Sequence, residues 1–202
     1  MPRPPDSRPA SSPSTAQDAW SAVILTGGTA RRLGGADKAA LVVGGTTLLD
    51  RSLAAVEAAA EVVVVGPSRA VGQEAGREVL FVREEPAYGG PAAAVATGLA
   101  AVGTSVVVVL AVDLPYVCAA TVDRLRLAAE GRDGSVLVDP DRRRQLAFVV
   151  RRAALAAVVP AETTGLALWR LLDPLDLAEV PARDDEAHDI DTWSDLPTAP
   201  SG

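Results

Sequence analysis

Short apolar runs alternate with helical patterns along most of the chain. The runs predict strands at 22–25, 62–65, 79–82, 105–112, 135–138, 146–150 and 177–180. Apolar residues at helical spacing predict helices at 92–101, 119–130, 152–158 and 165–172, and one more helix with Thr46 as its N-cap. Because strands and helices alternate, we expect an α/β fold, a single-domain three-layer sandwich with a mainly parallel, Rossmann-like sheet.

The run at 105–112 is the clearest strand. Its β-branched residues are typical of a strand that is buried on both faces in the middle of a parallel sheet. The run ends at Asp113, directly before Leu114 and Pro115. Ligands of open α/β sheets bind beyond the carboxyl ends of the strands. Asp113 is therefore placed either to bind Mg²⁺ together with phosphates or, more simply, to begin a turn.

The two ends of the chain differ from its middle. Residues 1–18 are rich in Pro and Ser and lack the apolar stretch of a secretory signal. We therefore predict disordered tails at 1–19 and 198–202 and one domain at 20–197. The apolar runs are far shorter than the roughly 20 residues that cross a bilayer. We expect no membrane span and, by default, a cytoplasmic location.

Charge and composition narrow the class of partner. The 26 acidic and 19 basic residues give a net charge of -7, and the aromatic residues are three Trp, two Tyr and two Phe. This balance argues against a nucleic-acid binder with a basic, aromatic face. A single cysteine, Cys118, and a single histidine, His188, exclude an intrachain disulfide and a zinc site of His and Cys, and favour a reducing compartment. A small anionic ligand stays open, because it needs only a local cluster of cations.

Such a cluster follows the first predicted strand. Residues 25–38, LTGGTARRLGGADK, contain four glycines with Arg31, Arg32 and Lys38. They match neither the G-x-G-x-x-G fingerprint nor the Gly-Lys-Ser/Thr of a P-loop. Glycines let backbone N–H groups approach phosphate oxygens, and the three cations add charge. Lys38 is the one lysine beside eighteen arginines, and a compact ammonium fits a crowded phosphate site where a planar guanidinium does not.

The same segment resembles the nucleotide-binding signature of the molybdenum cofactor guanylyltransferases, roughly L-A-G-G-x-x-x-R-M-G-G-x-D-K. Similar segments follow as E-x-P-x-x-G-G-P at 84–91, D-L-P at 113–115 and D-I-D-T-x-x-D-L at 189–196. The resemblance implies a fold of the nucleotide-diphospho-sugar transferase type. It also implies transfer of GMP from GTP to the phosphate of molybdopterin with release of pyrophosphate, and transient contacts with molybdoenzymes or cofactor-synthesis proteins.

The resemblance implies roles for individual residues as well. In the reaction, Lys38 steadies the α-phosphate, Arg32 holds the leaving pyrophosphate and Asp113 anchors Mg²⁺. The nucleotide site comprises Leu25, Thr26, Gly27, Gly28, Lys38, Glu85, Gly90, Pro91 and Asp113. Glu84 is placed as well as Glu85 to contact the base. No general base is needed, because a phosphate monoester is already ionised at neutral pH.

The acidic stretch near the end of the chain has two interpretations. Asp189 and Asp191 alternate across Ile190 and so point to the same side if extended. Asp191 then completes the metal site with Asp113, and both Asp189 and Asp191 contact the acceptor. Alternatively the stretch is a solvated acidic run, as we expect for its neighbours Asp184, Asp185 and Glu186.

Two other functions stay open. Thr26 stands where the family has alanine, and no proline follows Gln145, which leaves the base and the acceptor undecided. The first alternative is a cytidylyltransferase or a sugar-phosphate nucleotidyltransferase of the same fold. The second is a regulatory module that binds a nucleotide without catalysis. Arg32, Lys38 and Asp113 argue against the second, because binding alone does not require a metal-holding aspartate opposite the lysine.

Overall fold

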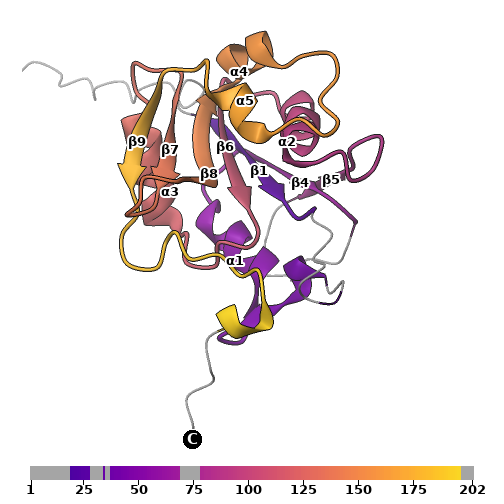
Figure 1. Cartoon of the computed structure of the whole chain (residues 1–202), viewed down its shortest axis with the longest axis vertical. Helices are drawn as coiled ribbons and strands as arrows, with labels where there is room; N and C mark the ends of the chain where they lie inside the picture. The colour runs from indigo at the N-terminus through magenta and orange to yellow at the C-terminus, as the bar shows by residue number, and fades with distance from the viewer. Residues whose placement is uncertain (1–18, 28–33, 35–36, 69–77, 197–202) are drawn as a thin grey trace, which may run out of the picture.

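A sheet of seven strands, in the spatial order β5-β4-β1-β6-β8-β7-β9, forms the centre of the molecule (Figure 1). The computed structural model describes residues 19–27, 34, 37–68 and 78–196. The strands are β1 (Trp20–Leu25), β4 (Glu61–Val65), β5 (Leu80–Val82), β6 (Val106–Ala111), β7 (Gly134–Val138), β8 (Arg144–Arg151) and β9 (Leu177–Pro181), with a separate hairpin of β2 (Val42–Val43) and β3 (Thr46–Thr47). The helices are α1 (Leu48–Ala55), α2 (Pro91–Ala100), α3 (Ala119–Ala128), α4 (Arg152–Val158) and α5 (Leu168–Leu172), with 3-10 turns η2 (Lys38–Ala40) and η4 (Trp193–Asp195).

The middle strand of the sheet is β6, as predicted. The pairs β1–β6, β1–β4, β4–β5 and β7–β9 are parallel, and β8 runs antiparallel to both of its neighbours. A mainly parallel sheet is thus confirmed. Leu25 of β1 is in register with Ala111 of β6. The loops after both strands therefore leave the same edge of the sheet, the lower one in Figure 1.

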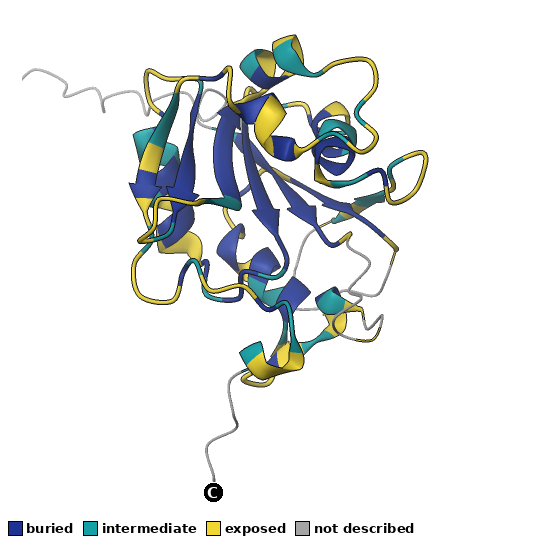
Figure 2. Ribbon diagram, viewed as in Figure 1, coloured by how far each residue is buried: buried dark blue, intermediate teal, exposed yellow. Residues whose placement is uncertain are grey.

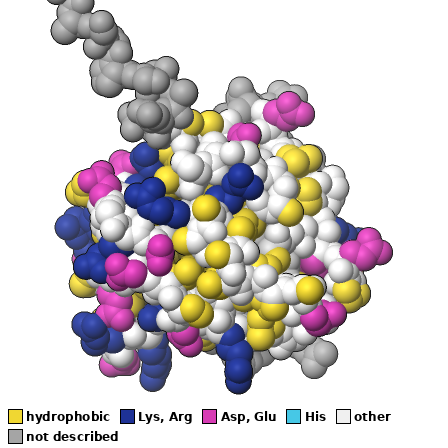
Figure 3. All heavy atoms as spheres, turned by 90° about the horizontal axis from the view of Figure 1, so that it is seen from above, with side chains coloured by type: hydrophobic (Ala, Val, Ile, Leu, Met, Phe, Trp, Pro, Cys, Tyr) yellow, Lys and Arg dark blue, Asp and Glu magenta, His cyan; other side chains and the backbone are white. Residues whose placement is uncertain are grey.

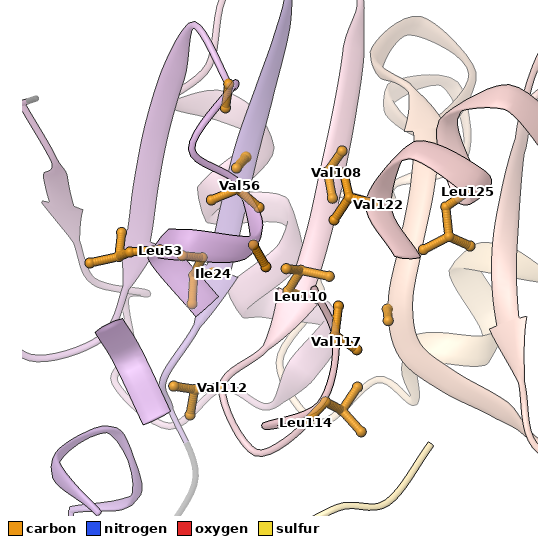
Figure 4. Packing of buried hydrophobic residues seen from close by; sticks show 14 of the residues in the cluster. Ile24, Leu53, Val56, Val108, Leu110, Val112, Leu114, Val117, Val122 and Leu125 are labelled. Atoms are coloured by element: carbon orange, nitrogen blue, oxygen red, sulfur yellow. The ribbon is translucent and has the colours of Figure 1, made fainter. Parts of the chain in front are cut away.

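Helices cover both faces of the sheet, whose strands are largely buried (Figure 2). Successive residues of a strand point to opposite faces. Ile24 accordingly packs with α1 and α3, whereas Val23 packs with α2, α4 and α5. Figure 4 shows part of the first cluster, in which Ile24 and Leu110 lie among residues of α1 and α3 such as Leu53 and Val122. The predicted three-layer sandwich is confirmed.

Two helix starts differ from the prediction. Thr46 is not the N-cap of α1, because its backbone pairs with Val43 in the hairpin. Thr47 caps the helix instead, and its hydroxyl accepts a hydrogen bond from the N–H of Asp50 at 3.0 Å. The helix predicted from residue 165 begins only at Leu168. Gly165 has a φ of 72°, which does not fit a right-handed helix.

Charged side chains of both signs gather on the left of the molecule in Figure 3, the side of β7 and β9. Ion pairs connect segments in and around these strands: Arg132–Asp176 at 2.6 Å, Arg144–Asp173 at 2.9 Å and Arg142–Glu179. This part of the surface mixes opposite charges and does not form a continuous basic face. Among the helices of the described segments, none combines the length and the apolar character that crossing a membrane requires.

Candidate active site

The chain leaves β1 at a fixed position. The N–H and the hydroxyl of Thr26 both donate to the carbonyl of Val65 in β4, at 3.0 and 3.1 Å. On the other side, the N–H of Val112 donates to the carbonyl of Leu25 at 3.0 Å. Gly66 lies so close that a Cβ atom there would be 2.1 Å from the hydroxyl oxygen of Thr26, so only glycine fits. The start of the glycine-rich segment is therefore held in place by hydrogen bonds on both sides of β1.

A cavity of about 300 Å³ opens beside these strand ends. Its walls are Leu25, Thr26, Gly27, Lys38, Glu84, Tyr88, Gly90, Pro91, Ala94, Ala111, Val112, Asp113 and Leu146. Seven of the residues predicted to bind a nucleotide are among them: Leu25, Thr26, Gly27, Lys38, Gly90, Pro91 and Asp113. Gly28 and Arg32 lie outside the described residues. A larger but open hollow of about 530 Å³ beside α4 and α5 contains none of the predicted residues.

The segment before α2 presents one of its two glutamates to the cavity. Glu84 lines the cavity, and its Oε1 atom lies 3.6 Å from the position that a Cβ atom on Gly27 would take. Glu85 is exposed and is not among the lining residues. Tyr88 and Leu146 line the cavity as well, although the sequence did not single them out. The one signal for Tyr88 was its place as the aromatic residue of the segment 84–91.

Lys38, which also lines this cavity, bridges two carboxylates. It opens η2, whose N-cap Asp37 accepts a hydrogen bond from the N–H of Ala39 at 3.1 Å. The ammonium of Lys38 donates to Asp113 Oδ2 at 3.0 Å and to Asp191 Oδ1 at 2.6 Å. Burial alone would lower the pKa of Lys38, but the charges and hydrogen bonds of the two carboxylates outweigh it and raise the pKa. Lys38 therefore stays charged at neutral pH.

Asp191 owes its position to the residues around it. The side chain of Ile190 is fully buried, and its N–H donates to the backbone carbonyl of Asp113 at 2.9 Å. One carboxylate oxygen of Asp195 accepts from the N–H groups of Asp191 and Thr192, at 3.0 and 2.7 Å. Residues 190–195 are thereby held against the end of β6, and Asp191 reaches Lys38.

The carboxylates of this site suit a metal ion that also binds phosphates. No three His, Cys, Asp or Glu side chains within the described ranges are grouped closely enough to hold a metal ion by themselves. Asp113 and Asp191 nevertheless both contact one ammonium nitrogen, so they can share a cation. Mg²⁺ is usually bound by one or two carboxylates together with water and substrate phosphates. Asp189 adds charge nearby: partial burial, and then the charges of Asp191 and Asp113, raise its pKa.

A buried ion pair holds the segment that leads to Asp189. Glu186 accepts hydrogen bonds from the Thr121 hydroxyl at 2.6 Å, from both terminal nitrogens of Arg124 at 2.9 and 2.8 Å, and from the N–H of Arg183 at 2.8 Å. The interpretation of Glu186 as a solvated charge is therefore wrong, since the residue is only 8% exposed. Burial alone would raise the pKa of Glu186, but the hydrogen bonds, those from Arg124 first, outweigh it and lower the pKa.

Glu186→Gln is expected to reduce the free energy of unfolding at pH 7 by about 1.5–3 kcal/mol, the usual range for hydrogen bonds to a charged group. The folded-state pKa of Glu186 lies below its ordinary value of 4.5, so the carboxylate stabilises the fold above that pH. The contribution is lost as the pH falls through the folded-state pKa. Urea unfolding between pH 7 and pH 3 measures the difference, with the exposed neighbour Asp185→Asn as control. A deficit that grows as the pH falls would contradict the role of the ionised carboxylate.

The fold and the cavity define a class of protein. A Rossmann-like sheet with a cavity beyond the carboxyl ends of β1 and β6, lined by a lysine and a carboxylate, is the arrangement of a nucleotide-binding α/β enzyme. The chain belongs to the MobA-like NTP transferase domain family, whose model matches residues 22–180. The predicted family resemblance, fold class and enzyme class are confirmed.

Relatives of the chain carry related names. It is 38% identical over 142 residues to a probable molybdenum cofactor guanylyltransferase of Opitutus terrae. The matched region covers 68% of this chain and 69% of the relative. The chain is 36% identical over 124 residues to a molybdenum cofactor guanylyltransferase of Mesorhizobium japonicum, with 57% and 58% covered. Among solved structures, a 2-C-methyl-D-erythritol 4-phosphate cytidylyltransferase of Thermus thermophilus is similar, with a TM-score of 0.64, 25% identity, and 87% and 94% of the two chains covered.

Proposed function

We propose that this protein transfers GMP from GTP to the terminal phosphate of molybdopterin and releases pyrophosphate. The observation that carries the proposal is the charged group of Lys38, Asp113 and Asp191, two of which line a cavity together with residues 25–27 at the start of the glycine-rich segment. The names of the relatives in Opitutus and Mesorhizobium support guanine as the base and molybdopterin as the acceptor. We also propose a cytoplasmic location, and transient contacts with molybdoenzymes or cofactor-synthesis proteins for delivery of the product.

In the proposed reaction, a phosphate oxygen of the acceptor attacks the α-phosphorus of GTP. A new P–O bond forms, the bond between the α-phosphorus and the bridging oxygen breaks, and pyrophosphate takes that oxygen and its electron pair. The acceptor phosphate needs no general base, because it is ionised at neutral pH. Catalysis then depends on positioning and on neutralisation of charge.

The residues of the chain divide this work. Lys38 supplies a permanent positive charge for the α-phosphate, and Arg32, outside the described residues, is proposed to hold the pyrophosphate. Asp113 and Asp191 would hold Mg²⁺, which when bound neutralises phosphate charge. Asp189 and Asp191 are proposed to face the acceptor. Together these two cationic and three carboxylate side chains would orient the two substrates in line.

Glu84 is proposed to select guanine. The guanine edge presents two adjacent donors, its N1–H and its amino group, and a carboxylate can accept from both. Cytosine and adenine place a ring acceptor beside a single amino group, so a carboxylate meets a lone pair there. Glu84 lines the cavity near Gly27, whereas Glu85 is exposed. Glu84 is therefore the better candidate of the two glutamates.

Pyrophosphate release from GTP, CTP and ATP, with and without molybdopterin, tests the proposed function. We expect release from GTP that depends on molybdopterin. Preference for CTP would favour the cytidylyltransferase alternative, and nucleotide binding without release would favour the regulatory module.

Glu84→Gln is expected to reduce the preference for GTP over CTP and ATP by about 10- to 100-fold, as for loss of a charge-assisted hydrogen bond. The matched control Glu85→Gln should keep the wild-type preference, and the reverse result would assign the base contact to Glu85.

A further inference from the structure

The side chain of Tyr88 stands at the rim of the cavity without being packed into the protein. It is 72% exposed and lines the same cavity as Glu84, Gly90 and Lys38. Within the part of the chain that the structure describes, it is the only aromatic residue among the lining residues. Its φ is 64°, in the left-handed region that a bulky side chain rarely adopts. Backbone strain of this kind persists where the surroundings impose it, and it clusters at functional sites.

The neighbours of Tyr88 impose this conformation. The carbonyl of Gly89 accepts a hydrogen bond from the N–H of Gly165 at 2.8 Å, and the carbonyl of Gly90 accepts from the N–H of Ala94 at 3.0 Å. Gly89 also lies so close to α2 that a Cβ atom on it would be 2.8 Å from the Cβ atom of Ala93. The two residues after Tyr88 are therefore fixed between α2 and the segment before α5. The backbone thus holds Tyr88 at the cavity, while the residue stays largely exposed.

The lining of the cavity combines two kinds of chemistry. Lys38 and Asp113 bring charges that suit phosphates. Beside Tyr88, the other lining residues include Pro91 and Ala94, which are apolar, and Glu84, which has a carboxylate. A nucleobase needs such surroundings: a flat apolar surface for its face and a polar group for its edge. Tyr88 and Glu84 belong to one short segment, so both can contact the same ring.

We propose that Tyr88 is a stacking residue for the nucleobase, so that its ring lies against the face of the base while Glu84 meets the edge. This inference rests on the proposed function of the cavity as a nucleotide site. The stacking contact would contribute to binding of the nucleobase separately from the contacts that bind the phosphates. The strained backbone then has a functional reason. Residues 89 and 90 are fixed by neighbouring elements, and the positive φ of Tyr88 lets its ring line the cavity in spite of that constraint.

Calorimetric titration of Tyr88→Ala with GTP and with inorganic tripolyphosphate tests this proposal. We expect the variant to bind GTP about 10- to 100-fold more weakly than the wild type, as for removal of one aromatic–base stack. Tripolyphosphate, which has no base, should bind both proteins equally. Tyr88→Phe keeps the ring and should stay within about threefold of the wild type. In turnover, Tyr88→Ala should raise the KM for GTP, with kcat and the KM for molybdopterin unchanged.

Several outcomes would overturn the proposal. One is wild-type affinity of Tyr88→Ala for GTP, and another is an equal loss for GTP and tripolyphosphate, which would indicate a damaged phosphate site. A rise in the KM for molybdopterin alone would assign Tyr88 to the acceptor. Tyr88→Gly removes the ring without the strain of a side chain at positive φ, so it keeps the test valid if the alanine variant fails to fold. If the wild type binds GTP with this dependence on Tyr88 but transfers nothing to molybdopterin, the proposed function fails and the stacking role stands.

Discussion

Asp113→Asn is expected to lower the rate of pyrophosphate release from GTP by on the order of 10²–10³-fold, the usual loss when one stabilising group is removed from a charged transition state. Asp113 follows the middle strand and contacts the ammonium of Lys38 at 3.0 Å. Asparagine keeps the shape of the side chain but removes the negative charge that a phosphate-bound cation requires. Steady-state release of pyrophosphate at saturating GTP and Mg²⁺, with molybdopterin as acceptor, measures the effect.

The same variant should fold normally. The backbone carbonyl of Asp113, which accepts the hydrogen bond from Ile190, is unchanged by the substitution. Asp123→Asn serves as control, because it removes a carboxylate of α3 whose side chain is 72% exposed. Its turnover should equal that of the wild type. Wild-type turnover of Asp113→Asn, together with unchanged Mn²⁺ binding in electron paramagnetic resonance titrations, would remove Asp113 from the metal site.

The position of the site follows from features that a sequence displays directly. A run of mostly β-branched residues is stable only when both of its faces are buried, which places β6 in the middle of the sheet. Parallel neighbours end at the same edge, so the segments after β1 and β6 have to meet. Leu25, Gly27 and Asp113 could therefore be assigned to one cavity before any coordinates, and the structure brings them together there.

The contacts inside the site could not be predicted in the same way. Asp191 lies 153 positions beyond Lys38, and Arg124 and Glu186 are 62 apart, so no local pattern joins the partners. The sequence suggested a lysine and a metal-holding aspartate facing each other, whereas the ammonium contacts the carboxylates directly. Glu186 looked like its exposed neighbours because composition does not show which of several adjacent carboxylates turns inward.

The conformation of Tyr88 has a similar explanation. The glycines that follow Tyr88 predict a turn, but they do not predict that the tyrosine itself takes a positive φ. The residue after it, Gly89, accepts a hydrogen bond from Gly165 and leaves no room for a Cβ atom beside Ala93 of α2, so the course of the chain here depends on other elements of the fold. Local propensity fails here because the packing of a distant segment decides the backbone. Departures of this kind are expected at functional sites.

The direct contact of Lys38 with Asp113 and Asp191 gives this lysine two tasks. With no cation between the carboxylates, the ammonium neutralises them, and its raised pKa keeps it charged. With a nucleotide bound, the same charge is needed by the phosphates. In the proposed reaction, Lys38 and a divalent cation would therefore compete for one pair of carboxylates, and a triphosphate that attracts the ammonium would favour the cation. Metal binding should consequently be stronger in the presence of GTP than in its absence.

Lys38→Met is expected to lower kcat by on the order of 10²–10³-fold, because the α-phosphate loses its cationic partner. In the absence of nucleotide, the variant should bind Mn²⁺ more tightly than the wild type, since no ammonium competes for Asp113 and Asp191. The two readouts move in opposite directions, which general unfolding of the site cannot produce. Stopped-assay kinetics and electron paramagnetic resonance titration measure them on the same preparations.

Lys38→Arg separates charge from shape. The guanidinium keeps the positive charge, but its planar fork is wider than an ammonium that now sits 3.0 and 2.6 Å from two carboxylates at once. We expect arginine to restore Mn²⁺ competition while recovering little of kcat, because the competition needs only charge and the α-phosphate needs a compact donor at one position. Full activity of the arginine variant would show that charge alone suffices, and the solitary lysine among nineteen basic residues would then have no chemical reason.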